Sequence, residues 1–269
     1  MTASYFGSRS FYSCRVGADE SGAFYLSDLQ AAGVATNPHP AADGTAPDAG
    51  LTGRCLVLIT PDAERSMNTF LGISTELSDQ QIDFDALAQS RLLYIEGYLV
   101  SSPKALQAAL QAKAFARAQG IEIAYTMSDT SMLQFFGDGV RQLLGDDGVD
   151  LLFCNKGEAL HWSGQTDLMA AAQALKTVAK RFCITLGAQG ALVFDGERYL
   201  TVAPNPVKPV DTNGAGDVFA GAFLHAYTAG HDCAAAGQLA SLASAHCVTQ
   251  FGPRLPGPVH AQIRSQVLG

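Results

Sequence analysis

The sequence lacks the features that mark membrane, secreted and nucleic-acid-binding chains. Its 269 residues contain no apolar run long enough to cross a bilayer, and residues 1–10 show no charged segment followed by an apolar one. Lys and Arg never cluster, and 25 acidic against 17 basic side chains give a formal net charge of -8. This charge would repel a phosphate backbone. We therefore expect a cytoplasmic protein that binds neither nucleic acid nor membrane.

The spacings typical of metal and disulfide sites are also missing. Six cysteines are scattered without a CxxC pair, and six histidines without an HxxxH pair. We therefore expect reduced cysteines that pack as small apolar side chains, and no zinc site. The GxGxxG motif of dinucleotide-binding oxidoreductases does not occur, which argues against that class of enzyme.

The composition is that of a globular chain with ample core material. Hydrophobic residues make up 48% of the sequence and charged residues only 16%. A chain of this length can bury most of its apolar surface in one α/β unit, so we expect a single domain over residues 1–269. Short β-branched runs alternate with helical stretches, and this alternation predicts a mainly parallel sheet covered by helices on both faces.

Individual elements follow from local signals. Residue Ser102 can cap a helix over residues 103–119 that Gly120 ends, between strands at 92–95 and 121–125. Two antiparallel hairpins are predicted, one on either side of Pro61-Asp62 and one on either side of Asp195-Gly196. The further predictions are strands at 149–154 and 182–186, a helix at 166–180, hairpin strands at 54–60, 66–71, 192–194 and 199–202, and a loop at 38–53.

The strongest chemical signal is the segment DTNGAGDVF at residues 211–219, which enters a helix with an apolar stripe. Backbone N–H groups of Gly214, Ala215 and Gly216 can converge on an anion at the amino end of that helix. Asp217 falls in the first turn, where a carboxylate either caps the helix or accepts a proton from a substrate hydroxyl. The spacing by itself does not decide between these two functions.

This segment resembles the C-terminal signature of the ribokinase (PfkB) carbohydrate-kinase family, whose pattern D-T-x-G-A-G-D it matches at every specified position. The resemblance implies a ribokinase-like three-layer α/β/α sandwich and an ATP-dependent phosphotransferase. It assigns Asp217 as the catalytic base, Gly214, Ala215 and Gly216 as the anion hole, and Asp211 and Thr212 as neighbours of the nucleotide phosphates.

Two more segments are similar to family motifs. Residues Asn155 and Glu158 match the family's Asn-x-x-Glu motif, which implies that Glu158 helps to position Mg²⁺ through water. Thr185, Gly187 and Gly190 match a Thr-x-Gly-x-x-Gly turn beside the nucleotide, although a solvated helix start and an ordinary strand-end turn would explain the two segments in isolation. The implied cofactors are ATP and Mg²⁺, and a requirement for K⁺ stays open.

The closer resemblance is to bacterial adenosine-kinase-like members, through residues 52–72 and 250–254. In that family the hairpin, here about residues 52–72, is a lid over the acceptor site that excludes water. Arg65 in this hairpin either pairs with a phosphate or is a solvated turn charge. The resemblance favours adenosine as the acceptor, and a sugar kinase such as a fructokinase or ribokinase is the alternative.

The resemblance departs from the family near residue 1. Residues 16–22 (VGADESG) match a stretch that other members reach only after an opening βαβ unit carrying acceptor-binding residues. We therefore expect that unit to be missing. A catalytically weak nucleotide-binding protein is then a second interpretation, because an acceptor must be held in line for transfer. An uncovered sheet edge, or the lid, would be the surface through which two copies pair.

Overall fold

The computed structural model describes residues 1–37 and 50–269, which form two compact units. Unit 1 comprises Met1–Asp83 and Asn205–Gly269, and unit 2 comprises Phe84–Pro204. Most of the loop predicted at 38–53 lies outside the described residues, and the assignment of residues 1–269 to one domain stays a prediction. In the described ranges, every helix is too short or too polar to span a bilayer.

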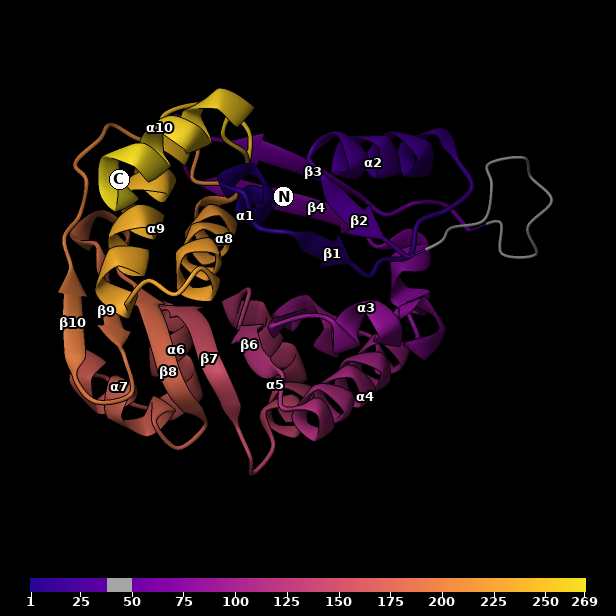
Figure 1. The fold of residues 1–269 in the computed structure, drawn as a ribbon, viewed down its shortest axis with the longest axis horizontal. Coiled ribbons are helices and arrows are strands. Elements are labelled where there is room, and N and C mark those ends of the chain that lie inside the picture. Colours follow the sequence, from indigo (N-terminus) through magenta and orange to yellow (C-terminus); the bar gives the residue numbers. More distant parts are fainter. Residues whose placement is uncertain (38–49) are drawn as a thin grey trace. The chain divides into compact units, whose positions relative to one another are not determined.

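Unit 2 is built on a six-stranded sheet with the strand order β10-β9-β8-β7-β6-β5 (Figure 1). Strands β5 to β8 run parallel, whereas β9 is antiparallel to β8 and β10 to β9. The predicted mainly parallel sheet and the second hairpin are confirmed. The strands are β5 (Leu92–Glu96), β6 (Glu122–Thr126), β7 (Val149–Asn155), β8 (Ala179–Thr185), β9 (Ala191–Phe194) and β10 (Tyr199–Val202).

The helices of unit 2 begin and end at residues with clear local causes. In α4, Ser102 accepts a hydrogen bond from the amide of Ala105, and Gly120 ends the helix in the left-handed region at φ 69°, as predicted. The helices are α3 (Phe84–Ala88), α4 (Pro103–Gln119), α5 (Thr130–Leu144), α6 (Lys156–Ser163) and α7 (Leu168–Leu175), with short 3₁₀ segments at Gly97–Ser101 and Gly187–Gln189.

The helix predicted at residues 166–180 is wrong at both ends. Helix α7 spans only Leu168–Leu175, because the Asp167 side chain caps it by accepting from the Ala170 amide. At the other end, the carbonyl of Val178 accepts from the amide of Val149, so the chain has already joined the sheet before Lys180. Strand β8 therefore begins at Ala179, three residues earlier than predicted.

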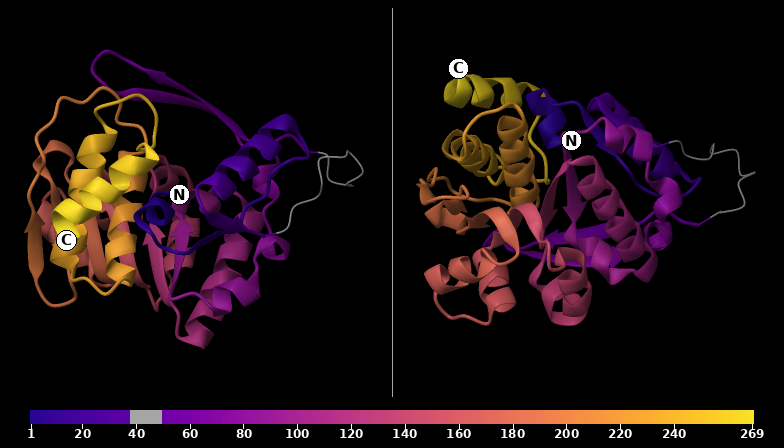
Figure 2. Two further views of the ribbon diagram at one scale, coloured as in Figure 1. Left: turned by 45° about the horizontal axis from the view of Figure 1, so that its top comes forward. Right: turned by 60° about the horizontal axis from the view of Figure 1, so that its bottom comes forward.

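Unit 1 contains two small sheets and five helices among its described residues. Strand β1 (Ser10–Tyr12) pairs in parallel with β2 (Val34–Thr36), and β3 (Arg54–Ile59) pairs antiparallel with β4 (Arg65–Phe70), which confirms the first hairpin. Figure 2 shows that hairpin as a long two-stranded ribbon. The helices are α1 (Thr2–Phe6), α2 (Glu20–Ala31), α8 (Ala215–Thr228), α9 (Cys233–Cys247) and α10 (Gly257–Leu268), with 3₁₀ segments at Gly72–Glu76 and Asp79–Gln81.

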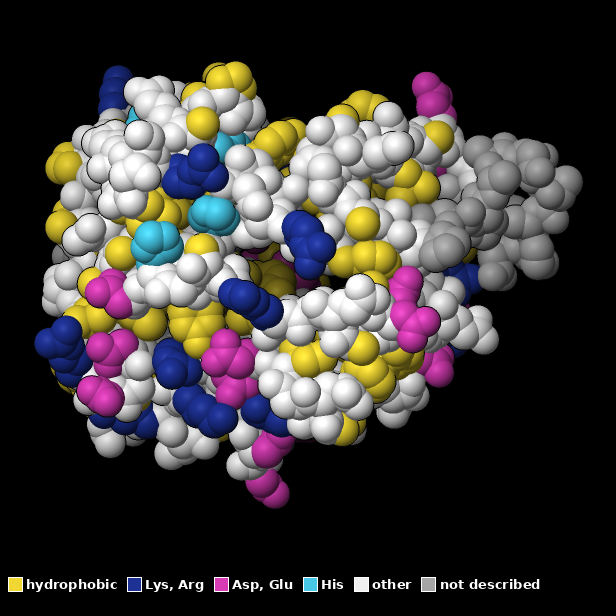
Figure 3. All heavy atoms as spheres, in the orientation of Figure 1, with side chains coloured by type: hydrophobic (Ala, Val, Ile, Leu, Met, Phe, Trp, Pro, Cys, Tyr) yellow, Lys and Arg dark blue, Asp and Glu magenta, His cyan; other side chains and the backbone are white. Residues whose placement is uncertain are grey.

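The burial of side chains agrees with two expectations from the sequence, except at one cysteine. The predicted apolar stripe of α8 is buried at Phe219 and Phe223, whose rings stack 6.3 Å apart. All six cysteines are free, and five are buried as expected, but Cys55 is exposed because it lies on the open β3–β4 hairpin. On the face drawn in Figure 3, basic and acidic side chains are interspersed rather than gathered by sign.

Candidate active site

The amino end of α8 has the geometry of an anion-binding site. Gly214 caps the helix at φ 74°, and a Cβ there would lie 2.4 Å from the carbonyl oxygen of Pro253, so only glycine fits. A Cβ on Gly216 would meet nothing within 4 Å. Packing therefore does not demand glycine at 216, and the space beside this helix end is open to a ligand that approaches the backbone N–H groups.

Asp217 lies in the first turn of α8, where it is accessible to solvent on one side and closely surrounded by protein atoms on the others. Desolvation by the surrounding protein raises the pKa of this carboxyl, and the positive charge of Arg65 opposes that rise. A carboxylate with a raised pKa accepts protons more readily than an ordinary aspartate does. The geometry is therefore compatible with a general base at the amino end of the helix.

Asp211 holds the loop in place. It is only 3% exposed, and its Oδ1 accepts from the amide of Asn213 at 2.8 Å. Its Oδ2 accepts from the amide of Gly252 at 2.9 Å, which ties the loop to the segment after α9. Because both oxygens accept backbone N–H groups, the geometry favours a positioning role over direct contact with phosphate.

Thr212 joins this loop to the turn of the β3–β4 hairpin. The carbonyl oxygen of Ala63 accepts from both the Thr212 amide, at 3.3 Å, and the Thr212 hydroxyl, at 3.0 Å. Arg65 donates to the same hydroxyl at 3.3 Å, which places its guanidinium beside the loop. Ala63 is buried in the left-handed region at φ 66°, a conformation that few alanines adopt.

Helix α9 supports the loop. The Ser244 hydroxyl donates to the carbonyl of Ala215 at 2.7 Å, and the Cys247 thiol lies 3.9 Å from the carbonyl oxygen of Asn213. Burial, together with the charges of Asp211 and Asp217, raises the pKa of Cys247 to about 11. This thiol is therefore protonated at neutral pH and acts as a packing group rather than a nucleophile.

A second group of predicted residues lies in unit 2, where β7 meets α6. Asn155 caps α6 by accepting from the Glu158 amide at 2.8 Å. The Glu158 carboxylate accepts from the Asn155 amide at 2.9 Å and from the Asn155 side chain at 2.6 Å. The two residues thus form a reciprocal capping box, which fixes the carboxylate at the carboxyl end of the sheet.

Glu158 is a buried carboxylate that no cation among the described residues neutralises. It is 3% exposed, and desolvation together with the charge of Asp129 raises its pKa to about 7. Neither acid forms an ion pair within residues 1–37 and 50–269. The described residues contain no cluster of three acidic, His or Cys side chains that could hold a metal ion. Oxygen donors of this kind fit Mg²⁺, which keeps several waters and shares few protein ligands.

The turn after β8 brings a third predicted segment next to the second. Strand register pairs Thr185 with Asn155, so these two strand ends are neighbours in the sheet. Gly190, at φ 87°, is required by the fold because a Cβ there would lie 2.1 Å from the carbonyl oxygen of Val202. Gly187, at φ 58°, faces open space. Thr185 and Gly187 are thus placed to contact a ligand at this edge of the sheet.

Residues 16–22 serve a structural purpose. Asp19 caps α2 by accepting from the Gly22 amide at 2.8 Å, and it accepts from the Thr52 amide at 3.0 Å and the Thr52 hydroxyl at 2.5 Å. These bonds, led by the Thr52 hydroxyl, lower the pKa of Asp19. Gly17 donates to the same hydroxyl at 2.9 Å. This stretch therefore anchors the base of the β3–β4 hairpin to α2.

The predicted residues thus fall into two groups. Sequence reasoning missed the partners that hold them, because these contacts are remote in the chain or belong to unremarkable residue types. The first group, in unit 1, is Arg65, Asp211, Thr212, Gly214, Ala215, Gly216 and Asp217. The second, in unit 2, is Asn155, Glu158, Thr185, Gly187 and Gly190. The missed partners are Ala63, Ser244, Gly252 and Pro253, and Asp129 was missed as the acid whose charge raises the pKa of Glu158.

Comparison with known protein families gives a match over nearly the whole chain. The model of the pfkB family carbohydrate kinases matches residues 1–259. The adenosine kinase of Schizophyllum commune is 30% identical over 230 residues, which cover 77% of this chain and 65% of the relative. The chain thus spans just under two thirds of that relative's length.

Solved structures give the same result at the level of the fold. The adenosine kinase of Sinorhizobium meliloti superposes with a TM-score of 0.91 at 32% identity, over 98% of this chain and 80% of that one. An aminoimidazole riboside kinase of Salmonella enterica, complexed with its riboside and an ATP analog, has a TM-score of 0.79 at 19% identity, over 99% of this chain and 88% of that one. The predicted ribokinase-like α/β fold is confirmed.

Proposed function

The chain belongs to the pfkB family of carbohydrate kinases, and from this premise we propose that it transfers the γ-phosphate of Mg·ATP to a hydroxyl of a nucleoside or sugar. It is a kinase by family, and the open question is its acceptor. The observation that carries the proposal is the amino end of α8, where an open glycine backbone adjoins a carboxylate of raised pKa.

In the proposed reaction, the backbone N–H groups of Gly214, Ala215 and Gly216 stabilise the charge that develops on the transferred phosphoryl group. Asp217 accepts the proton of the acceptor hydroxyl as the oxygen attacks phosphorus. The acceptor oxygen gains the bond to phosphorus, and the β-phosphate of ADP leaves with the electron pair of the broken bond. No covalent enzyme intermediate is needed.

Arg65 and Thr212 hold the other side of this site. The guanidinium of Arg65 lies by the Thr212 hydroxyl, and its charge acts on Asp217. We propose that Arg65 pairs with phosphate oxygens during transfer. The β3–β4 hairpin that carries it exposes apolar side chains on both faces, which supports a lid that covers an acceptor. Leu56, Leu58, Met67 and Phe70 are among these exposed side chains.

We further propose functions for the predicted residues of unit 2, considered by themselves. Glu158, oriented by Asn155, would hold Mg²⁺ through water, and Thr185 and Gly187 would adjoin the nucleotide. When bound, Mg²⁺ would neutralise charge on the phosphates. The buried, unpaired charge of Glu158 supports this role, because a cation would relieve its desolvation.

Adenosine is the proposed acceptor, because two of the similar proteins are adenosine kinases. The test is ADP release from Mg·ATP with adenosine, other nucleosides, ribose and fructose as acceptors. We expect the greatest release with a nucleoside. Release with ribose or fructose alone would instead identify a sugar kinase, and ATP binding without any acceptor-dependent release would identify a nucleotide-binding protein.

Asp217→Asn is the decisive variant. It should lower turnover by about 10² to 10⁴-fold while nucleotide binding is retained, because only proton transfer is lost. Asp232→Asn is the matched control, since Asp232 caps the neighbouring helix α9 and lies outside the proposed site. Turnover by Asp217→Asn equal to that of the control would reject the assignment of the base.

A further inference from the structure

Tyr125 carries a buried hydroxyl for which residues 1–37 and 50–269 provide no hydrogen-bond partner. It lies on β6 and is 0% exposed, and its hydroxyl meets no donor or acceptor in the described part of the chain. A buried hydroxyl without a partner destabilises the folded state, and a phenylalanine would fill the same space without that cost. The hydroxyl therefore calls for a physical explanation.

The surroundings of Tyr125 are acidic. Register pairs it with Ile95 on β5 and Leu152 on β7, so Glu96 at the end of β5 and Glu158 just beyond β7 lie at the same end of the sheet. Burial and then the charges of Glu158 and Glu96 raise the pKa of Tyr125, which keeps its hydroxyl protonated and able to donate. The hydroxyl is thus a donor among carboxylates that it does not reach directly.

The Glu158 carboxylate can accept further hydrogen bonds. Each oxygen of Glu158 accepts one bond from Asn155, and each has a second lone pair. Glu96 accepts from the Ser128 hydroxyl through Oε2, at 3.4 Å. A water molecule between a buried donor and buried acceptors makes two or more bonds, which is the usual condition for an ordered internal water.

We propose that the Tyr125 hydroxyl binds an internal water that bridges it to Glu158 and Glu96, and that this bridge fixes the orientation of the Glu158 carboxylate. Tyr125 would then be a positioning residue rather than a catalytic one. The second part of this inference rests on the proposed role of Glu158 toward Mg²⁺. Groups that orient the residues around a metal commonly change its affinity 10- to 100-fold.

Tyr199 provides a matched control. Its hydroxyl is the other buried side-chain group without a partner among the described residues. Its ring packs against Phe194 at 5.2 Å and carries Lys176 over it at 4.6 Å, contacts that explain the aromatic ring but not the hydroxyl. Tyr199 is the control because it is a tyrosine with a buried hydroxyl on β10, three strands away from β7 in the sheet order. Tyr199→Phe removes the same atom from strand β10 and leaves the acidic end of β6 untouched.

The first test is a crystal structure of the protein and of Tyr125→Phe at a resolution that shows ordered water. We expect a water within hydrogen-bond distance of Tyr125 Oη and of carboxylate oxygens of both Glu158 and Glu96, and its loss in the variant. A dry Tyr125 hydroxyl, or a water that persists in Tyr125→Phe, would overturn the inference whatever the protein's activity.

The second test measures two quantities. One is the Mg²⁺ concentration that gives half-maximal nucleotide binding, measured by calorimetry, and the other is the Mg²⁺ concentration that gives half-maximal turnover. We expect Tyr125→Phe to raise both about tenfold and Tyr199→Phe to leave both unchanged. Glu158→Gln separates the two claims. If Glu158→Gln leaves the Mg²⁺ dependence unchanged, the proposed role of Glu158 is wrong. If Glu158→Gln shifts the Mg²⁺ dependence but Tyr125→Phe has the same Mg²⁺ dependence as Tyr199→Phe, the positioning role of Tyr125 is wrong.

Discussion

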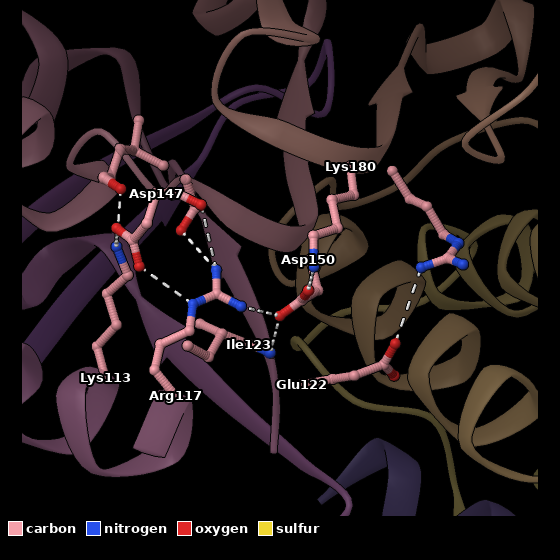
Figure 4. Close-up of polar contacts among 10 residues, drawn as sticks. Lys113, Arg117, Glu122, Ile123, Asp147, Asp150 and Lys180 are labelled. Carbon is pink, nitrogen blue, oxygen red and sulfur yellow. Dashed lines mark hydrogen bonds and ion pairs between the residues drawn. The ribbon is translucent and has the colours of Figure 1, made fainter. Parts of the chain in front are cut away.

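The two ends of the parallel strands in unit 2 differ in whether their acidic side chains are neutralised by cations of the described residues. At the amino ends of β6 to β8, acidic and basic side chains form a connected network of ion pairs (Figure 4). At the carboxyl ends, Glu158 and Asp129 interact unfavourably and make no ion pair within the described ranges. One sheet thus has a neutralised end and an acidic end.

The neutralised end is centred on Asp150, which is 5% exposed. Its Oδ1 accepts from Lys180 at 2.7 Å, and its Oδ2 accepts from Arg117 at 2.7 Å and from the Ile123 amide at 2.8 Å. Burial alone would raise the pKa of Asp150, but these bonds and charges lower it below its ordinary value. Buried Lys113 completes the network by donating to Asp147 at 2.6 Å.

This difference indicates at which end of the sheet a ligand-binding site is expected. A chain that surrounds one aspartate with two cations can neutralise buried acids, so the unneutralised acids at the other end are better explained by a ligand than by poor packing. Ligands bind at the carboxyl ends of the strands in open α/β sheets. The predictions below test whether the two ends carry stability and function separately.

The largest effect on stability is expected from Asp150→Asn. It leaves Arg117 and Lys180 without their buried acceptor, and we expect the free energy of unfolding to fall by about 3 kcal/mol. Denaturant unfolding measures this loss. Turnover at saturating Mg·ATP should stay within about twofold, since the strand ends of the proposed site are untouched. A large loss of turnover in the folded variant would show that the two ends are not separable.

Glu158→Gln should have the opposite effect to Asp150→Asn: the stability should be retained and the Mg²⁺ dependence of turnover should change. Glutamine can still accept from the Asn155 amide, so the capping box and the stability are kept. The Mg²⁺ requirement should rise about 10- to 100-fold, because the buried negative charge is gone. Titration of turnover with Mg²⁺ measures this change. A normal Mg²⁺ requirement together with a large loss of stability would mean that Glu158 is a structural cap.

The dependence of stability on pH should have opposite signs at the two ends. The folded-state pKa of Glu158, about 7, exceeds its ordinary value of 4.5, so the folded state binds more protons between these values. Stability from this group therefore rises as pH falls from 8 to 5. Asp147 and Asp150 have lowered pKa values, so their contribution is present above about pH 4 and is lost as pH falls below it.

The experiment compares the protein with Glu158→Gln in the absence of Mg²⁺. From pH 8 to pH 5, the protein should gain about 2 kcal/mol of unfolding free energy relative to the variant. The comparison cancels the contributions of buried His225 and His260, whose pKa values are lowered by burial in both proteins. A constant difference across this range would mean that Glu158 titrates as an ordinary glutamate.

The smallest effect is expected from Asp138→Asn. Asp138 pairs with Arg141 at 3.3 Å on the surface of α5, and both side chains are exposed. Solvent screens such a pair, so the free energy of unfolding should change by less than about 0.5 kcal/mol. The variant is also the charge-matched control for Asp150→Asn. A comparable loss in both variants would point to net charge rather than to the buried network.

The sequence predicted a helix or hairpin correctly where the residues that determine it lie within a few positions of one another. The capped helix Pro103–Gln119 and both hairpins were predictable, and so was the start of helix α8 directly after the glycine turn. The ion network was not, since Asp150 meets Arg117 across 33 residues of chain and Lys180 across 30. Tyr125 resembles any aromatic residue in a strand until its hydroxyl is found without a partner.

The contact between Thr212 and Ala63 joins residues that are 149 positions apart in the sequence. Because it links the hairpin turn to the loop before α8, it can be used to measure whether the hairpin moves. The Thr212 amide donates to the Ala63 carbonyl, so its proton exchanges with solvent only when the hairpin turn separates from the loop at residues 211–216. The exchange rate of this one amide should therefore record how often the hairpin opens. A bound substrate that holds the hairpin down should slow that exchange without touching Thr212.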